Sequence, residues 1–296
     1  FRSQKENRRL IARGRGIASM GLTEYDQAVQ YFTEALELSD GWVQNVDYDM
    51  NYYLAGAYRK NGQPAEAKKV YDAILGLKPE EKDAYFLRGS AELELGDYES
   101  AKADFDKAIS MDPKNYDRLI EIYEALADYG YREVGQEYLQ NVLNTDKKLD
   151  AYDSGRIYYY LGDYQKAYLA LEEAKGKGGV DSYLYLGKAY AATGDYNYAS
   201  SVYSNYLSKQ GPDAEIYNQL GLCELAKKDY QKALEAFQAG KQIEGNSLMQ
   251  TLSFNEIVAY EYLQDYQKAA VLLKAYLQNY PDDQAAIREQ QFLSTR

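Results

Sequence analysis

Residues 83–113 read DAYFLRGSAELELGDYESAKADFDKAISMDP. Two segments of helical length flank Gly96, Asp97 and Tyr98 in this stretch. Glycine suits the left-handed conformation that closes one helix, and aspartate can cap the N-terminus of the next. Proline cannot continue a helix, so Pro113 marks the end of the second segment. The stretch therefore predicts two helices joined by a tight turn.

The same pattern recurs along the chain. A tyrosine is followed three residues later by alanine, and four residues further on by a large apolar residue, at Tyr25, Tyr98, Tyr164, Tyr196, Tyr230 and Tyr266. The spacing is about 34 residues throughout once degenerate copies centred on Pro64 and Arg132 are placed between these tyrosines. Such self-similarity predicts an array of stacked units.

Small residues recur at fixed places within each repeat. We number every repeat so that the recurring tyrosine is position 17; position 20 is then usually alanine, and position 8 is glycine at Gly16, Gly89, Gly155, Gly187 and Gly221. A glycine inside a helix costs about 1 kcal/mol relative to alanine. A recurrent one implies that the two helices of each repeat cross closely at that point.

This pattern resembles the tetratricopeptide repeat family, which carries small residues at positions 8 and 20, an aromatic residue at 17 and proline at 32. The resemblance implies an all-α, right-handed superhelical solenoid of about eight helix-turn-helix repeats. We place the repeats at residues 9–46, 48–81, 82–115, 116–147, 148–179, 180–213, 214–249 and 250–281, with a capping helix over residues 283–294. Residues 1–296 are expected to form a single solenoid domain.

The fourth repeat departs most from the pattern. Tyr123 stands at position 8, Arg132 at position 17 and Gly135 at position 20. A large residue at the expected crossing point predicts that this helix pair is splayed.

The amino-acid composition argues against some classes of binding partner. The net charge is -12, which argues against nucleic acid and against an anionic membrane surface as ligands. No stretch approaches the 18 apolar residues of a membrane-spanning helix, so we expect no direct membrane insertion. The chain begins at Phe1 with a basic segment, and we expect that something upstream is missing. A membrane-tethered or exported protein whose signal was removed and a cytoplasmic protein both stay open.

The sequence favours a protein that is not an enzyme. It contains no histidine, which removes the commonest general base and the imidazole metal ligands. Its single cysteine, Cys223, lies between Leu222 and Leu225 and is expected to be a buried, inert thiol. Residues 47–51 begin like a calcium loop, but Tyr52 replaces the required glycine. We therefore predict no catalytic residues, no cofactor and no metal.

The first helix of each repeat has two sides. Positions 4, 7, 8 and 11 pack within the array, and positions 2, 5, 9, 12 and 13 form the opposite side, which we name the first-helix face. The family resemblance implies that this face lines a concave groove where an extended or helical peptide binds. We predict contacts to a peptide or protein ligand from Tyr52, Arg59, Phe86, Glu121, Glu124, Tyr152, Arg156, Tyr159, Tyr185, Lys188, Asn218 and Phe254.

Charge on the first-helix face is almost balanced. The acids at position 2 lie in the first turn of a helix, where a carboxylate is favoured whatever the ligand. When these position-2 acids are set aside, two local groups of residues stand out on the face. One is acidic, around Glu121 and Glu124, and the other is aromatic and basic, from Tyr152 to Lys188. We expect these two to lie beside each other.

A chaperone-tail adaptor is not expected. Clamps of that kind in the family use lysine at position 5 and asparagine at position 9, whereas the first repeat has Arg13 and Ile17 and the second has Tyr52 and Gly56.

The sequence thus predicts a non-catalytic scaffold or adaptor that binds a peptide or protein segment in its groove. Two alternatives stay open: an assembly protein that forms homo-oligomers through the solenoid ends or the convex face, and a peptide-responsive regulatory module. Trp42, in the long first connector, is expected to fold back on the protein's own core rather than to anchor a partner.

Overall fold

A computed structural model describes residues 2–39, 41 and 44–296. Trp42 lies outside the described residues. Within them the chain forms seventeen α-helices and no strand, which confirms the predicted all-α repeat solenoid. The chain divides into two compact units, Phe1–Asn141 and Val142–Arg296, and we treat each by itself. The single domain over residues 1–296 stays a prediction.

The first unit contains the helices of the first repeats, and its boundary falls within α8. These helices are α1 (Arg2–Gly21), α2 (Tyr25–Glu37), α3 (Asn45–Lys60), α4 (Pro64–Leu77), α5 (Lys82–Glu94), α6 (Tyr98–Met111), α7 (Tyr116–Asp128) and α8 (Arg132–Thr145).

The second unit contains four further pairs and a last helix. They are α9 (Ala151–Tyr160), α10 (Tyr164–Glu173), α11 (Val180–Ala192), α12 (Tyr196–Lys209), α13 (Ala214–Ala226), α14 (Tyr230–Lys241), α15 (Met249–Tyr262), α16 (Tyr266–Asn279) and α17 (Gln284–Leu293).

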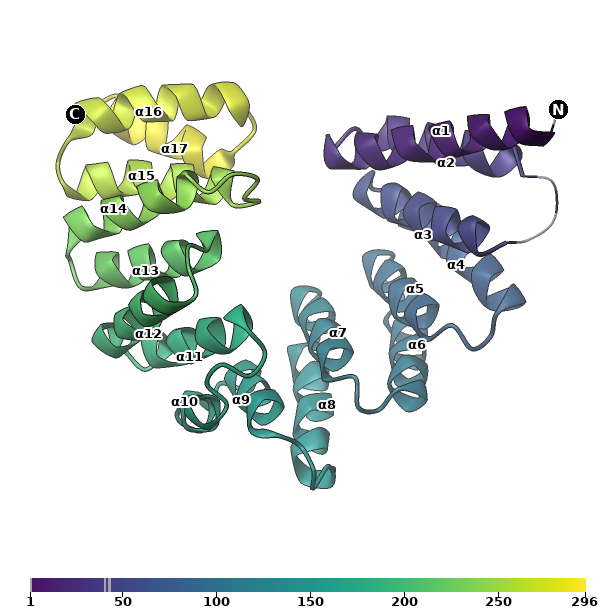
Figure 1. The fold of residues 1–296 in the computed structure, drawn as a ribbon, viewed down its shortest axis with the longest axis horizontal. Helices are drawn as coiled ribbons and strands as arrows, with labels where there is room; N and C mark the ends of the chain where they lie inside the picture. The colour runs from purple at the N-terminus through teal and green to yellow at the C-terminus, as the bar shows by residue number, and fades with distance from the viewer. Residues whose placement is uncertain (1, 40, 42–43) are drawn as a thin grey trace. The chain divides into compact units, whose positions relative to one another are not determined.

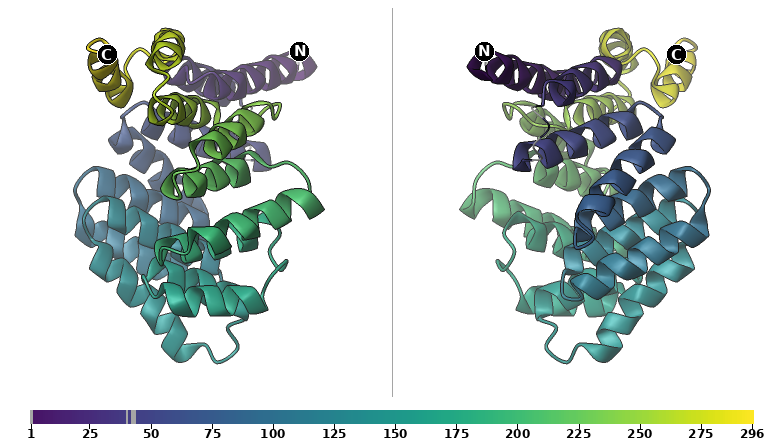
Figure 2. Two further views of the ribbon diagram at one scale, coloured as in Figure 1. Left: turned by 90° about the vertical axis from the view of Figure 1, so that its left-hand side faces the viewer. Right: turned by 90° about the vertical axis from the view of Figure 1, so that its right-hand side faces the viewer.

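Within each unit the helices form two layers. Odd-numbered helices pack on the helix that follows them, as α1 does on α2 and α13 on α14, and several also contact the next odd-numbered helix, as α1 does with α3 and α11 with α13. Figure 1 shows this alternation along each unit, and Figure 2 shows successive hairpins lying side by side. The odd-numbered helices are the first helices of the repeats, so the first-helix faces of one unit follow one another on one side.

The predicted turns are present. Gly96 has a φ of 78°, and the side chain of Asp97 accepts a hydrogen bond from the backbone N–H of Ser100 at the start of α6. Asp163, Asp195, Asp229 and Asp265 cap the equivalent helices in the same way. Lys228 and Gln264 adopt the left-handed conformation without being glycine, so the turn persists where the sequence departs from Gly-Asp-Tyr.

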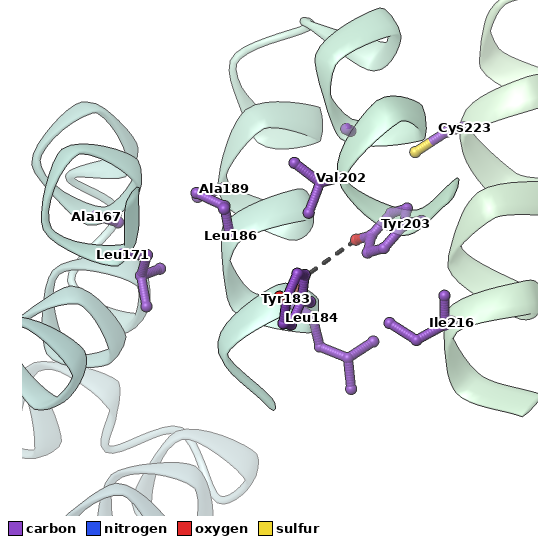
Figure 3. Packing of buried hydrophobic residues seen from close by; sticks show 11 residues of the cluster. Ala167, Leu171, Tyr183, Leu184, Leu186, Ala189, Val202, Tyr203, Ile216 and Cys223 are labelled. Atoms are coloured by element: carbon purple, nitrogen blue, oxygen red, sulfur yellow. Dashed lines mark hydrogen bonds between the residues drawn. The ribbon is translucent and has the colours of Figure 1, made fainter. Parts of the chain in front are cut away.

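The recurrent glycines lie where the paired helices cross, as predicted. A methyl group on Gly187 of α11 would lie 2.2 Å from Cζ of Tyr203, and one on Gly221 of α13 would lie 2.3 Å from Cε1 of Phe237. Figure 3 shows Tyr203 reaching across to α11, where its hydroxyl donates to the backbone carbonyl of Leu184 at 3.5 Å. Position 8 of the first helix therefore makes room for the large residue at position 24 of the second.

The prediction of a splayed fourth repeat is wrong, because the large and small partners have exchanged places. A methyl group on Gly135 of α8 would lie 2.9 Å from Cδ2 of Tyr123 on α7. Arg132 donates to the hydroxyl of the same tyrosine at 2.9 Å. The close approach is kept because either helix can supply the small residue.

The two ends of the array differ from the simple repeat. Helix α1 begins at Arg2, several residues before the repeat pattern becomes recognisable. At the other end α17 buries Ala286 and Leu293 against the core formed with α16, including Leu273 and Tyr276. This confirms the predicted capping helix.

Candidate binding surface

Ion pairs link consecutive first helices in the first unit. Arg13 of α1 donates from Nε to Asp49 of α3 at 2.9 Å, and Arg59 of α3 donates from Nε to Glu94 of α5 at 2.8 Å. A further pair joins Arg118 of α7 to Asp83 of α5 at 2.8 Å. Much of the charge on the first-helix face is therefore paired within the protein, and Arg59 is one of the residues that we predicted to contact a ligand.

The aromatic residues predicted in the first unit lie mostly against their own repeat. Tyr52 is half-buried with its ring centroid 6.4 Å from that of Tyr71, and Phe86 lies 6.1 Å from the ring of Phe105. Burial and the nearby Glu81 carboxylate raise the pKa of the Tyr52 hydroxyl. Both position-5 rings thus contribute to the core as well as to the surface.

The two predicted acids remain on the surface of α7. Glu121 and Glu124 are exposed, and Arg118 lies 3.2 Å from the Glu121 carboxylate. They belong to the first unit, whereas the aromatic and basic concentration belongs to the second. Their expected proximity stays a prediction.

Four tyrosines gather on α9, α10 and α11 in the second unit. The ring centroid of Tyr159 lies 5.5 Å from that of Tyr160, 5.7 Å from that of Tyr164 and 5.6 Å from that of Tyr185. The hydroxyl oxygens of Tyr160 and Tyr185 are 3.0 Å apart and share a hydrogen bond. Burial raises the pKa of the Tyr159 hydroxyl, so this phenol stays neutral. We call these four residues the tyrosine cluster.

Arg156 lies below the surface rather than on it. The residue is only 7% exposed, its guanidinium donates to the Asp153 carboxylate at 2.5 Å, and it lies 4.5 Å from the centroid of the Tyr152 ring. Tyr152 in turn packs against the connector at Gly178. The expectation of an open position is therefore wrong for Arg156, which is buried beside Asp153 and Tyr152 of its own helix.

The remaining predicted residues continue the surface along α11, α13 and α15. Lys188 lies 3.5 Å from the Glu215 carboxylate of the next first helix. Asn218 is buried and accepts a hydrogen bond from Asn255 at 2.8 Å, so it too is not open. Phe254 is half-buried, with its ring 5.7 Å from that of Tyr276.

Sequence reasoning overlooked an apolar side chain on this surface. Leu222, at position 9 of the seventh repeat, is 40% exposed on α13. Tyr262, at position 13 of the eighth, is 54% exposed and stacks on Tyr230 with centroids 4.9 Å apart. Leucine is ordinary in any helix, so only its position in the repeat register could have indicated this exposure.

The described residues show few features of a catalytic or metal-binding site. Cys223 is buried, and burial raises the pKa of its thiol to about 12, which confirms the predicted buried thiol. In the part of the chain that the structure describes, no group of three or more acidic or cysteine side chains could hold a metal ion. None of the described helices combines the length and the apolar character needed to cross a bilayer.

One buried carboxylate lies away from the first-helix face. Glu92 of α5 is buried, with Lys68 3.6 Å from its Oε1, and its Oε2 has no hydrogen-bond partner among the described residues. Desolvation, with a further contribution from the negative charge of Asp104, raises the pKa of Glu92 to about 7. The folded protein therefore binds this proton more tightly than the unfolded chain does.

We expect Glu92→Gln to stabilise the protein at alkaline pH and to have little effect in acid. The stability that Glu92 contributes is full below its ordinary pKa of 4.5 and is lost as the pH rises through about 7. At about pH 8 the variant should be more stable by on the order of 1–3 kcal/mol, with the gap closing toward about pH 5. Urea unfolding across this range measures the difference.

Glu224→Gln is the matched control, because Glu224 occupies the same repeat position on α13 and is also buried. Its carboxylate accepts from Lys227 at 2.8 Å, so this variant should lose stability by losing the ion pair. A Glu92→Gln variant that is destabilised at every pH would contradict the assignment.

Comparison with known proteins identifies the family to which the chain belongs. A tetratricopeptide repeat model matches residues 13–67, 52–116 and 184–247, which together span more than half of the chain. The chain belongs to the tetratricopeptide repeat family. A second tetratricopeptide repeat model matches residues 254–283, in the eighth repeat.

Individual tetratricopeptide repeat proteins are similar to the chain at modest identity. It is 27% identical over 233 residues, or 77% of its length, to tetratricopeptide repeat protein 21B of Xenopus laevis. It is 30% identical over 105 residues, or 35% of its length, to the Hsp70-Hsp90 organizing protein of Triticum aestivum. The matched parts span only 15% and 17% of these relatives.

A solved structure shows the same fold. A tetratricopeptide repeat protein from Parabacteroides merdae aligns with a TM-score of 0.52 at 14% identity, covering 86% of this chain and 99% of that protein.

Proposed function

We propose that the protein is a non-catalytic scaffold that binds an extended or helical protein segment along the first-helix face of its second unit. Tetratricopeptide repeat proteins act as protein-interaction scaffolds. One relative, the Hsp70-Hsp90 organizing protein, is named for two proteins that it organises. Because the chain lacks the clamp residues at positions 5 and 9, we do not propose those partners for it.

The tyrosine cluster is the observation that carries the proposal. The rings of Tyr159, Tyr160 and Tyr185 are held edge to face at 5.5–5.9 Å, and the hydroxyls of Tyr160 and Tyr185 share a hydrogen bond, so little ordering is needed when a ligand binds. Tyrosine offers a large apolar area together with a polar group, which suits the centre of a binding site.

The rest of this face fits a protein ligand of mixed character. Exposed Leu222 and Tyr262 supply apolar contacts beyond the cluster. Lys188 is paired with Glu215, so the surface near the cluster carries little unbalanced charge. A segment with apolar side chains at intervals suits such a surface better than a strongly charged one does.

Selection of peptides from a random displayed library on the intact protein tests the proposal. We expect selected peptides to lose affinity by about tenfold or more in Leu222→Asp, because a charge placed in an apolar contact is costly. Titration of each purified peptide, followed by fluorescence anisotropy, measures the change.

Leu169→Asp is the matched control. Leu169 is 60% exposed on α10, a second helix, so the same charge there should leave peptide affinity unchanged. Thermal unfolding of both variants checks that neither has lost its fold. Equal loss in the two variants, or a selection that yields no binding peptide, would refute a ligand site on the first-helix face. Light scattering over a concentration series separates a receptor from the assembly alternative, since an assembler grows in mass.

A further inference from the structure

A pocket of about 520 Å³ lies at the C-terminal end of the second unit, between α15, α16 and α17. Three aromatic side chains and one valine make its apolar part, and two carboxylates make its polar part. The lining residues are Val258, Glu261, Tyr262, Tyr266, Glu289 and Phe292. Its volume lies in the range of ordinary ligand sites.

The two glutamates of this pocket lack a cation. Glu261 of α15 and Glu289 of α17 both line the pocket, and the negative charge of Glu289 acts on the Glu261 carboxylate. Oε1 of Glu261 is buried without a hydrogen-bond partner among the described residues. Desolvation and the charge of Glu289 raise the pKa of Glu261 to about 7, and no basic side chain in the described part of the chain offsets this rise. A second negative charge in this pocket therefore needs a positive partner.

The aromatic wall already holds a guanidinium group. The guanidinium carbon of Arg296 lies 4.6 Å from the centroid of the Phe292 ring and 5.8 Å from that of Tyr266. Both rings line the pocket. Among the described ion pairs none joins Arg296 to either glutamate, so its contact with the wall is to the ring faces. The aromatic side of the pocket can therefore stack on a planar cation. The carboxylates beside it have no cationic partner among the described ion pairs.

We propose that this pocket binds the guanidinium group of an arginine side chain from a partner protein. Guanidinium stacks on aromatic faces and donates two parallel hydrogen bonds to a carboxylate, so it can use both kinds of wall at once. An ammonium group offers neither the flat face nor the paired donors. Binding replaces the proton on Glu261 by the cation, and the two carboxylates of the pocket then lie beside one positive charge.

The site fits the proposed function and deepens it. Glu261 and Tyr262 occupy positions 12 and 13 of the eighth repeat, so two of the residues that line the pocket belong to the first-helix face. The proposal rests on the proposed function for the source of the arginine, which is a bound protein segment. The pocket itself can be tested with the side chain alone.

The probe is N-acetyl-arginine methylamide, titrated into the isotopically labelled full chain and followed by amide NMR. We expect shifts confined to the walls of the pocket, with a dissociation constant on the order of 1 mM, as befits a single side chain. N-acetyl-citrulline methylamide has the same shape without the charge and should bind about tenfold more weakly. Glu261→Gln and Glu289→Gln should each weaken the arginine probe by about tenfold.

The pH dependence gives an independent readout. Besides the two carboxylates, the titratable or charged groups around the pocket are the hydroxyls of Tyr262 and Tyr266 and the Arg296 guanidinium, which lies over the Phe292 and Tyr266 rings. Because the cation competes with the proton on Glu261, arginine binding should strengthen from about pH 6 to about pH 8 in the native protein, and this dependence should weaken in Glu289→Gln, which lacks the charge that helps to raise the pKa of Glu261.

Glu244→Gln, an exposed acid outside the pocket, is the control and should bind the probe as the native protein does. Equal binding of arginine and citrulline probes, shifts spread away from the pocket, or no binding at about 20 mM probe would overturn the proposal. If the arginine probe binds in the pocket but the selected peptides bind Leu222→Asp as tightly as the native protein, the pocket is supported and the proposed ligand site on the first-helix face is rejected. If the peptides lose affinity in Leu222→Asp but the arginine probe does not bind, only the pocket is rejected.

Discussion

Replacing Arg9 by methionine should lower the free energy of unfolding of the first unit by about 3–5 kcal/mol. Arg9 of α1 is 1% exposed, and its guanidinium is paired with the buried carboxylate of Asp47 on α3. Methionine keeps much of the apolar stem but removes the cation. Asp47 would then be a buried charge without its partner, which is far more costly than the loss of an exposed pair.

The chain supplies a matched control on the same two helices. Arg13 of α1 reaches Asp49 of α3, but these side chains are 31% and 43% exposed. Water can solvate the carboxylate when the arginine is removed, so Arg13→Met should cost no more than about 1 kcal/mol. Urea unfolding together with hydrogen exchange of the α1 amides measures both variants.

A double variant separates the buried charge from simple loss of packing. Asp47→Leu in the Arg9→Met background removes the unpaired carboxylate, and should recover part of the lost stability. Asp47 also accepts from the backbone N–H of Gln44 at 2.7 Å, so recovery is expected to be incomplete. If the double variant is no more stable than Arg9→Met, burial of an uncompensated charge is not the cause.

Gly16→Ala should destabilise the first unit by about 1–3 kcal/mol, although alanine is the better helix former. A methyl group on Gly16 of α1 would lie 2.7 Å from Cε1 of Phe32 on α2. The ring of Phe32 is fully buried, so it cannot move aside without displacing its neighbours. The overlap therefore outweighs the gain of about 1 kcal/mol in helix propensity.

Gly14→Ala provides the comparison within the same helix. No atom lies within 4 Å of a methyl group placed on Gly14, so this change should stabilise α1 by up to about 1 kcal/mol. Thermal and urea unfolding of the two variants should thus show effects of opposite sign. The same sign for both would mean that helix propensity, rather than the crossing of α1 and α2, explains the glycine at position 8.

The repeat pattern predicted the fold because its signals are local. Gly96 and Asp97 specify a turn and a cap through their own backbone and side-chain geometry, and the tyrosine at position 17 recurs in register with them. The fourth repeat differs from the prediction because its large and small residues have exchanged helices. Gly135 and Tyr123 show that the crossing needs one small partner on either helix.

The candidate site could be predicted only in part. The register correctly indicated that tyrosines gather on α9 and α11. It did not indicate that Arg156 and Asn218 are buried, or that Arg59 is paired with Glu94. Burial and pairing depend on the neighbouring repeat, whose side chains are far away in sequence.

The sequence by itself determined the helices, their caps and turns, the repeat length and the family, because each depends on residues within one repeat. Only the tertiary structure decided which charges are neutralised and where a pocket remains. The ion pair of Arg59 with Glu94, and the pocket that Glu261 and Glu289 line together, both join residues of different helices. Such contacts require two helices to be in register, and a small shift between them would pair different side chains.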